Sequence, residues 1–198
     1  MIELGAGVGL TGIVAAGLCQ AKYFHMTDYT EGCLENMEHN IAINEGWLRR
    51  QGVNVEGNEY QRKLGSGYLE WTECAKGDKE RSAREMSTSE PFRFSEAEVL
   101  LAADVVYDMS QIPSLVQCVK VLLSSGEDAG STEKRKAIFA TTFRNEKTFA
   151  LFTHELLCEG IACDYVEKEV IASLPHIFPC YFIQPRSDVR ICTMTMDC

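Results

Sequence analysis

Apolar and polar positions along this chain separate short strands from amphipathic helices. Residues 2–4 form a short apolar run, and residues 23–27 form a second run that ends at Asp28. Between the two runs, apolar residues recur at the spacing of one helix face, which predicts a helix there. The residues that fall on one face of this helix are Leu10, Ile13, Val14 and Leu18.

The alternation of strands and helices continues through the middle of the chain. Apolar residues at helical spacing predict a second helix, with Gly46 as its stop. The residues that repeat at this spacing are Leu34, Met37 and Ile41. A strand is expected within residues 60–69, and the apolar run 99–103 is typical of a strand buried on both faces.

The last third of the chain repeats the pattern. Ser110 is a suitable cap for a helix whose apolar stripe is Ile112, Leu115, Val116, Val119, Leu122 and Leu123. A loop is expected at 126–133 and a strand at 137–142. Asn145 can cap a helix that carries Phe149, Phe152 and Leu156 and stops at Gly160. Two final strands are predicted at 162–170 and 189–195.

These elements define an α/β fold in one domain that spans residues 1–198. Helices between buried strands indicate a mostly parallel, Rossmann-like sheet that is covered on both faces. The last two strands have no predicted helix between them, so we expect them to form an antiparallel edge hairpin. Residues 72–95 are rich in Lys, Arg, Glu and Ser, which predicts a mobile, solvated insertion.

Composition narrows the classes of function. The formal net charge of −10 argues against a general nucleic-acid binder and suits a basic partner or a cationic ligand. No apolar run reaches the roughly 20 residues of a membrane span. The nine cysteines are odd in number and contain no C-x-x-C pair, which favours reduced thiols in a cytosolic or nuclear compartment over disulfides or a zinc site.

The glycine-rich turn after the first strand is the main chemical signal. A turn of this kind lets a nucleotide-like ligand lie against bare backbone at a helix N-terminus. Gly7-Val8-Gly9-Leu10-Thr11-Gly12 fits the dinucleotide pattern G-x-G-x-x-G. Gly5-x-Gly7-x-Gly9 with Glu3 two positions earlier fits an S-adenosylmethionine turn instead. The turn by itself leaves both cofactors open.

Residues at other strand ends separate the two interpretations. Asp28, which follows Gly7 by 21 residues, can accept the ribose hydroxyls of either cofactor or cap the next helix. Trp71 can flank an adenine, although a core or surface tryptophan fits equally well. Asp104 and Tyr107 follow the buried strand 99–103, where ligands of open α/β sheets bind. A nicotinamide enzyme would also need a substrate domain, for which 198 residues leave little room.

Together these pieces resemble a known group. Glu3-Leu4-Gly5-Ala6-Gly7-Val8-Gly9-Leu10, Thr27-Asp28, Leu69-Glu70-Trp71 and Asp104-x-x-Tyr107 occur in the order found in the seven-strand S-adenosylmethionine-dependent methyltransferases, specifically lysine methyltransferase family 16. The segment from Phe143 to Leu156 looks most like the branch that methylates a lysine of translation elongation factor 2.

The resemblance implies a cofactor site and a partner. Residues Gly5, Ala6, Gly7 and Gly9 would hold the methionine part of S-adenosylmethionine, and Glu3 would orient its ammonium group. Asp28 would hold the ribose and Trp71 would border the adenine. Ala103 and Asp104 would line the floor near the sulfonium. We expect a protein substrate, with elongation factor 2 as the first candidate, and a monomeric enzyme in the cytoplasm that binds no nucleic acid, membrane or metal.

Asp104 and Tyr107 are the expected catalytic residues. The target lysine must react as the neutral amine, and deprotonation at pH 7 costs about 4.6 kcal/mol from a reference pKa near 10.4. An apolar slot beside a sulfonium would lower that pKa. Asp104 and Tyr107 would then orient the amine, and either Asp104 or water would take the proton.

Two expectations concern the start of the chain and the competing classes of function. Family members carry a substantial segment before the first strand, and this chain begins at that strand, so we expect it to bind S-adenosylmethionine weakly at best. The alternatives are an NAD-dependent α/β enzyme and an interaction module that keeps the methyltransferase fold without full activity.

Overall fold

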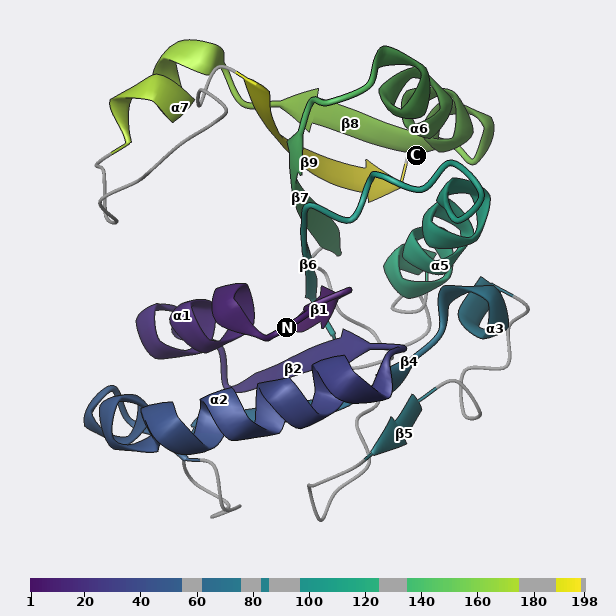
Figure 1. The fold of residues 1–198 in the computed structure, drawn as a ribbon. Helices are drawn as coiled ribbons and strands as arrows, with labels where there is room; N and C mark the ends of the chain where they lie inside the picture. Colours follow the sequence, from purple (N-terminus) through teal and green to yellow (C-terminus); the bar gives the residue numbers. More distant parts are fainter. Residues whose placement is uncertain (55–61, 76–82, 86–96, 125–134, 175–187, 197–198) are drawn as a thin grey trace.

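Strands β1 (Ile2–Leu4) and β2 (Tyr23–Asp28) lie side by side in the middle of one mixed sheet (Figure 1). The computed structural model describes residues 1–54, 62–75, 83–85, 97–124, 135–174 and 188–196. The other strands are β3 (Val53–Asn54), β4 (Arg62–Leu69), β5 (Ala83–Glu85), β6 (Val99–Ala103), β7 (Lys136–Thr142), β8 (Ile161–Tyr165) and β9 (Val189–Met196). The helices are α1 (Leu10–Leu18), α2 (Glu31–Arg50), α3 (Trp71–Ala75), α5 (Ile112–Ser124), α6 (Glu146–Cys158) and α7 (Lys168–Ser173).

The sheet confirms the predicted fold class. Within the described ranges it has nine strands in the order β3-β4-β2-β1-β6-β7-β9-β8, and β5 pairs with β4. Without the short β3 and β5, seven strands form the Rossmann-like path. Strand β9 runs antiparallel to both β7 and β8, whereas the pairs from β3 to β7 along this path are parallel. The C-terminal edge is therefore antiparallel, as predicted.

The connection at that edge differs from the prediction. The strand expected at 162–170 ends at Tyr165, and α7 follows it, so β8 and β9 are not joined as a simple hairpin. Strand β9 lies between β7 and β8, which leaves β8 as the edge strand. Of the insertion expected at 72–95, the described residues include α3 through Ala75 and β5, while the rest and the loop expected at 126–133 lie outside them.

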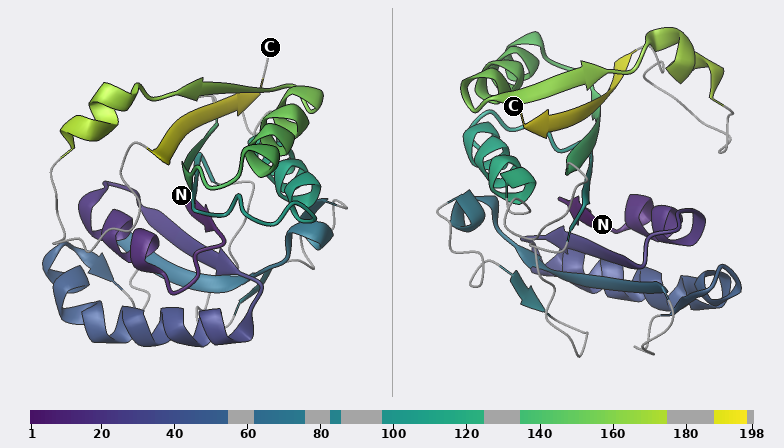
Figure 2. Two further views of the ribbon diagram at one scale, coloured as in Figure 1. Left: turned by 45° about the horizontal axis from the view of Figure 1, so that its top comes forward. Right: turned by 180° about the vertical axis from the view of Figure 1, so that it is seen from behind.

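Two apolar clusters pack on opposite faces of the sheet, and the helices divide between them (Figure 2). One cluster joins α1 and α2 to Phe24, Met26 and Leu64. The other joins α3, α5 and α6 to strand residues such as Leu100 and Phe139. Because side chains alternate along a strand, neighbouring strand residues enter different clusters. The predicted stripe of α5 is entirely buried in the second cluster.

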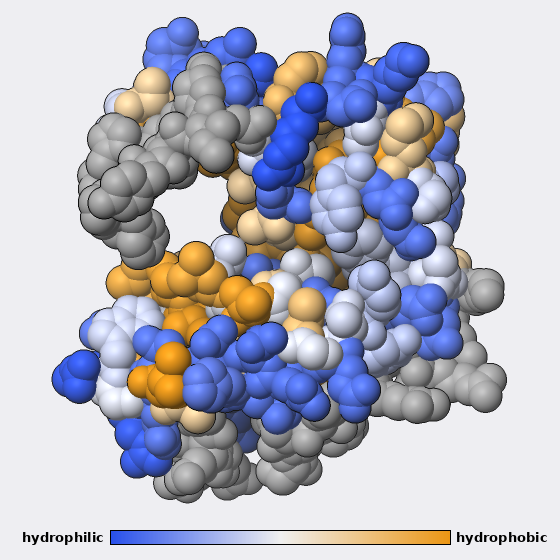
Figure 3. All heavy atoms as spheres, in the orientation of Figure 1, coloured by the Kyte–Doolittle hydropathy of each residue, from blue (hydrophilic) through white to orange (hydrophobic). Residues whose placement is uncertain are grey.

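Helix α1 has the predicted bounds but buries a different face. Leu10 and Leu18 are 61% and 66% exposed, and Figure 3 shows apolar side chains gathered on the surface over α1. The buried residues of this helix are Gly12, Ile13, Ala16 and Gly17. Of the apolar face that the spacing indicates, Ile13 is buried and Val14 is half-buried, while both leucines are exposed. The small residues Gly12, Ala16 and Gly17 allow the helix backbone itself to pack closely.

Two helix ends also differ from the prediction. Helix α2 continues past Gly46 to Arg50 and stops before Gly52, whose φ is +75°. Ser110 does not cap α5: its hydroxyl donates to Asp108 at 2.8 Å, and the helix begins two residues later, at Ile112. The Asn145 cap of α6 is confirmed, since its side chain accepts from the N–H groups of Lys147 and Thr148.

The seven cysteines that the structure describes are free thiols. Among the described helices, none combines the length and the apolar composition that crossing a membrane requires.

Candidate functional site

The glycine turn leaves β1 and leads directly into α1. Gly5, Gly7 and Gly9 all have left-handed backbones, with φ of +61°, +56° and +82°. A Cβ built on Gly5 would lie 2.9 Å from Val105, but one on Gly7 would meet nothing within 4 Å. Packing therefore requires glycine at position 5, whereas Gly7 presents bare backbone to open space. This arrangement, ahead of a helix N-terminus, can receive an anionic or strongly polar ligand group.

Asp28 ties this turn to the end of β2. Its Oδ2 accepts from the Gly7 N–H at 3.0 Å, and its Oδ1 accepts from the Thr30 N–H at 3.1 Å, just before α2 begins. The N-cap residue of α2 is Thr30 and not Asp28, so the expected cap is replaced by this contact with the residue that precedes the helix. Each carboxylate oxygen has a further lone pair, so the same group can still accept from ligand hydroxyls.

Glu3 places a buried carboxylate behind the turn. The residue is 1% exposed, and its Oε2 has no hydrogen-bond partner among the described residues. Burial raises the pKa of Glu3 to about 7, against the opposing effect of hydrogen bonds from Gly12 and Thr11. A buried carboxylate without a counter-charge is costly, and a cationic ligand group would offset that cost.

Trp71 borders the turn from the other side. It is the first residue of α3, directly after β4, and its ring lies 3.2 Å from where a Gly5 Cβ would be. The preceding Glu70 accepts from the hydroxyls of Tyr68 and Thr72, which fixes the entry into α3. The structure therefore brings Gly5, Asp28 and Trp71 to one edge of the sheet, as the sequence predicts.

Asp104 stands at the end of β6 in an unusual backbone conformation. Its φ is +59°, and its N–H donates to the Ala140 carbonyl of β7 at 2.7 Å. Two nitrogens of the Arg144 guanidinium donate to its carboxylate oxygens at 2.7 and 2.6 Å. The hydrogen bond from Arg144 holds the pKa of Asp104 below its ordinary value.

Sequence reasoning did not place Arg144 in the site. Arg144 follows β7 by two residues, and β7 is the parallel neighbour of β6, so both residues leave the sheet at the same edge. The order of the strands, rather than any local motif, brings the guanidinium to Asp104. A prediction of β6 and β7 as neighbours would have been the signal.

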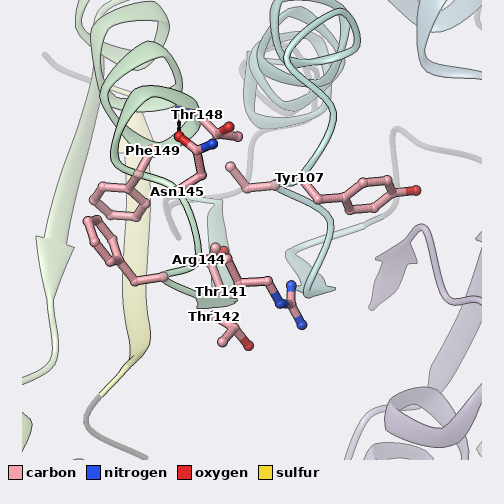
Figure 4. A pocket seen from close by; sticks show the side chains of 9 residues that line it. Tyr107, Thr141, Thr142, Arg144, Asn145, Thr148 and Phe149 are labelled. Atoms are coloured by element: carbon pink, nitrogen blue, oxygen red, sulfur yellow. Dashed lines mark hydrogen bonds between the residues drawn. The ribbon is translucent and has the colours of Figure 1, made fainter. Parts of the chain in front are cut away.

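Tyr107 faces away from this ion pair. No hydrogen bond joins its hydroxyl to Asp104 in the described part of the chain, and the residue is 67% exposed. Partial burial raises the pKa of Tyr107, and the nearby Tyr29 and Asp28 at the end of β2 raise it further. Figure 4 shows the ring extending away from Asn145 and Phe149.

A cavity of about 110 Å³ lies between the end of β7 and the start of α6 (Figure 4). Its lining residues are Val106, Tyr107, Thr141, Thr142, Phe143, Arg144, Asn145, Thr148 and Phe149. Phe143 and Phe149 meet edge to face, with ring centres 5.3 Å apart. The site therefore has two parts along one sheet edge. One is the glycine turn with Glu3, Asp28 and Trp71, and the other is this cavity with Arg144, whose guanidinium binds Asp104.

Comparisons with known proteins agree with this geometry. A family model described as lysine methyltransferase matches residues 1–149. The chain is 28% identical over 167 residues to the protein-lysine N-methyltransferase EEF2KMT of Bos taurus, and 29% identical over 166 residues to EEF2KMT of Homo sapiens. These alignments cover 84% and 81% of this chain but 46% and 43% of those proteins, so the chain spans somewhat less than half their length.

A solved structure shows the same fold. The methyltransferase domain of bacterial CtHen1 aligns with a TM-score of 0.53 and 12% identity, over 98% of this chain and 89% of that chain. Fold and site together define a Rossmann-like methyltransferase. Because the family model covers well over half of the sequence, the chain belongs to the lysine methyltransferase family. This membership favours a methyl donor over a dinucleotide at the glycine turn.

Proposed function

We propose that this chain is an S-adenosylmethionine-dependent protein-lysine N-methyltransferase. The observation that carries the proposal is the pairing of bare backbone at Gly7 with the buried carboxylate of Glu3, whose Oε2 has no hydrogen-bond partner among the described residues. A ligand with an amino-acid end and a nucleoside end matches both features. Glu3 would hold its ammonium group, Asp28 its ribose hydroxyls, and Trp71 would border its adenine.

The residues present therefore fit the cofactor. When bound, S-adenosylmethionine supplies an electrophilic methyl group on a sulfonium. Gly5, Ala6, Gly7 and Gly9 would hold its methionine part, and Ala103 would line the floor beside the reacting centre. The task of the protein is then alignment, because methyl transfer to an amine is a direct displacement.

The acceptor side of the site suits a lysine. Asp104 would orient the amine through its carboxylate, and Tyr107 would donate or accept a hydrogen bond from the side of β2. Asp104 is a weak base because Arg144 lowers its pKa and uses both carboxylate oxygens. The amine proton is therefore better released to bulk solvent than held on Asp104.

For the substrate we propose a translation elongation factor, with elongation factor 2 first. Two observations support this choice: the resemblance of the Phe143–Leu156 segment to that branch, and the curated relatives named EEF2KMT. The net charge of −10 suits a basic target surface.

The decisive experiment incubates the chain with labelled S-adenosylmethionine and cell extract, and identifies the labelled protein and residue by mass spectrometry. A label on lysine of an elongation factor supports the proposal in full. A label on another protein would reject the elongation factor as substrate but keep the methyltransferase activity. Cofactor binding without transfer would favour the impaired interaction module, and binding of NAD in place of S-adenosylmethionine would favour a dinucleotide enzyme.

A matched pair of variants locates the cofactor by calorimetry. Gly7→Ala adds a methyl group to the open space beside the turn, so cofactor affinity should fall by about tenfold or more. Gly160→Ala is the control, because Gly160 also has a positive φ, of +66°, and nothing within 4 Å of its Cβ position, but it follows α6 at the opposite edge of the sheet. Equal losses in both variants would reject the site.

A further inference from the structure

The Asp104 carboxylate is already engaged by a cation from its own chain. Arg144 donates to both oxygens, at 2.7 and 2.6 Å, in the bidentate geometry typical of arginine–carboxylate pairs. The Thr142 N–H also approaches Oδ1, at 3.4 Å. An incoming amine therefore cannot occupy the same oxygens in the same way unless the Arg144 guanidinium moves.

Opening the ion pair between Asp104 and Arg144 costs little free energy. The two side chains are 46% and 45% exposed, and ion pairs in solvent contribute little to stability. The next residue, Asn145, is fixed because its side chain caps α6. The Arg144 guanidinium can thus leave Asp104 by rotation of its own side chain, while the backbone stays in place.

The cavity beside the ion pair offers a route to it. Arg144 and Thr142 form one side, while Phe143 and Phe149 add apolar surface (Figure 4). Asp104 itself does not line the cavity, but Arg144, which binds it, does. A polar side at Arg144 and an apolar wall suit the four methylenes and the terminal amine of a lysine side chain.

We propose that Arg144 is a gate for the acceptor: its guanidinium rests on Asp104 where the amine of the target lysine binds, and it withdraws when the lysine enters. This inference rests on the proposed function, because it takes an amine as the acceptor. The gate also makes Arg144 a specificity-determining residue. An apolar side chain that displaced Arg144 would leave the carboxylate without a donor, whereas an amine replaces the donors that were lost.

The test uses n-butylammonium, which reproduces the end of a lysine side chain. Its binding to the full chain is followed by NMR through the backbone amides of Asp104 and Thr142. The proteins compared are the wild type, Arg144→Gln, Asp104→Asn and the charge-matched control Arg190→Gln. Arg190 is a suitable control because its guanidinium lies over the Phe143 ring, 5.4 Å from the ring centre, at the same corner of the site.

Arg144→Gln should bind n-butylammonium about two- to fivefold more tightly than the wild type, because no ion pair has to open first. Arg190→Gln should change the affinity less, and Asp104→Asn should abolish the shifts at both amides. Unchanged or weaker binding by Arg144→Gln would overturn the gate, since Arg144 would then merely hold Asp104 in position. An equal gain in Arg190→Gln would also overturn it, because the gain would reflect general charge.

This test is separate from that of the proposed function, since binding of n-butylammonium needs no methyl transfer. The expected binding pattern without methylation of any extract protein would reject the enzyme function and retain the gate. Methylation of a lysine together with unchanged binding by Arg144→Gln would reject the gate alone.

Discussion

Asp104 combines a left-handed backbone with a charged side chain that the proposed chemistry requires. Its φ is +59°, a region that Asp and Asn tolerate better than other non-glycine residues. Asparagine therefore preserves the backbone and the side-chain shape and removes only the charge. Alanine would add backbone strain and confuse the two effects.

Asp104→Asn should lower methyl transfer by about a hundredfold or more, because the amine loses its orienting carboxylate. Tyr107→Phe should lower it by up to about tenfold, the contribution of one hydrogen bond. Both residues are exposed, so the free energy of unfolding should change by less than about 1 kcal/mol. Initial rates with labelled donor and urea denaturation measure the two quantities. Near-normal transfer by both variants would contradict these roles.

Glu3 is a buried residue whose negative charge opposes folding. Because its folded pKa is about 7, the folded state keeps a proton that the unfolded state releases above its ordinary pKa of about 4.5. Stability is therefore lost as the pH rises from about 4.5 to 7, by up to about 3 kcal/mol. Glu3→Gln should remove this loss and stabilise the free protein at pH 8 but not at pH 4, in urea denaturation. Equal effects at both pH values would contradict the assignment.

At this scale the sequence predicts contacts near the turns better than contacts between strands. Asp28 was expected at the glycine turn from its spacing, and it accepts from the Gly7 N–H. The partner of Asp104 was not foreseen, because Arg144 lies 40 residues away and reaches it only through the pairing of β6 with β7. The burial of Glu3 likewise depends on α1 packing over β1.

At the scale of elements, positions were predicted well and buried faces less well. The bounds of α1 follow from its apolar residues, but Leu10 and Leu18 point to the surface. A Cβ on Gly12 would lie 2.4 Å from Met26, and one on Gly17 would lie 2.1 Å from Trp47. The buried face of α1 is thus the one where its glycines let the helix backbone approach Met26 and Trp47. The spacing of apolar residues does not reveal this close approach.

Gly17→Ala should destabilise the fold by about 1–3 kcal/mol, because the added methyl group meets the Trp47 ring and must push α1 away from α2. Gly46→Ala is the matched control. Gly46 lies inside α2, and its Cβ would meet only the end of the Arg50 side chain, at 3.8 Å. Alanine there should stabilise the fold by about 0.5–1 kcal/mol. Thermal or urea unfolding of both variants checks the opposite signs; destabilisation of equal size in both would show that the packing of α1 on α2 is not the cause.

At the scale of the whole molecule, alternating strands and helices were enough to predict a parallel sheet covered on both faces. They could not predict that β9 inserts between β7 and β8, because strand order is set by long-range packing rather than by the local pattern. They also missed α7, a helix of six residues, too short to show a clear period. The position of the candidate site was predictable for the same reason, since Glu3, Asp28 and Asp104 lie in or directly after parallel strands.

The two faces of the sheet lead to a last prediction, about pH. Burial lowers the pKa of His25 in the folded protein to about 4. As the pH falls, His25 is therefore protonated in the unfolded chain before it is protonated in the folded one. Stability is lost as the pH falls from about 6.5 to 4. Glu3 has the opposite sign, with stability lost as the pH rises from about 4.5 to 7. In register, Glu3 pairs with Met26 and His25 with Ile2, so the two side chains point to opposite faces and should act independently.

Relative to the wild type, His25→Gln should therefore gain stability progressively as the pH falls below 6.5, whereas Glu3→Gln should gain it as the pH rises above 4.5. The double variant should show both trends, with the two single effects adding at each pH. Urea denaturation of the four proteins from pH 4 to pH 8 measures the trends as differences, so a constant packing cost of either substitution cancels from the slope. Parallel curves for His25→Gln and the wild type would show that His25 titrates alike in the folded and unfolded states. A double variant that departs from additivity would show that the two buried groups interact through the sheet.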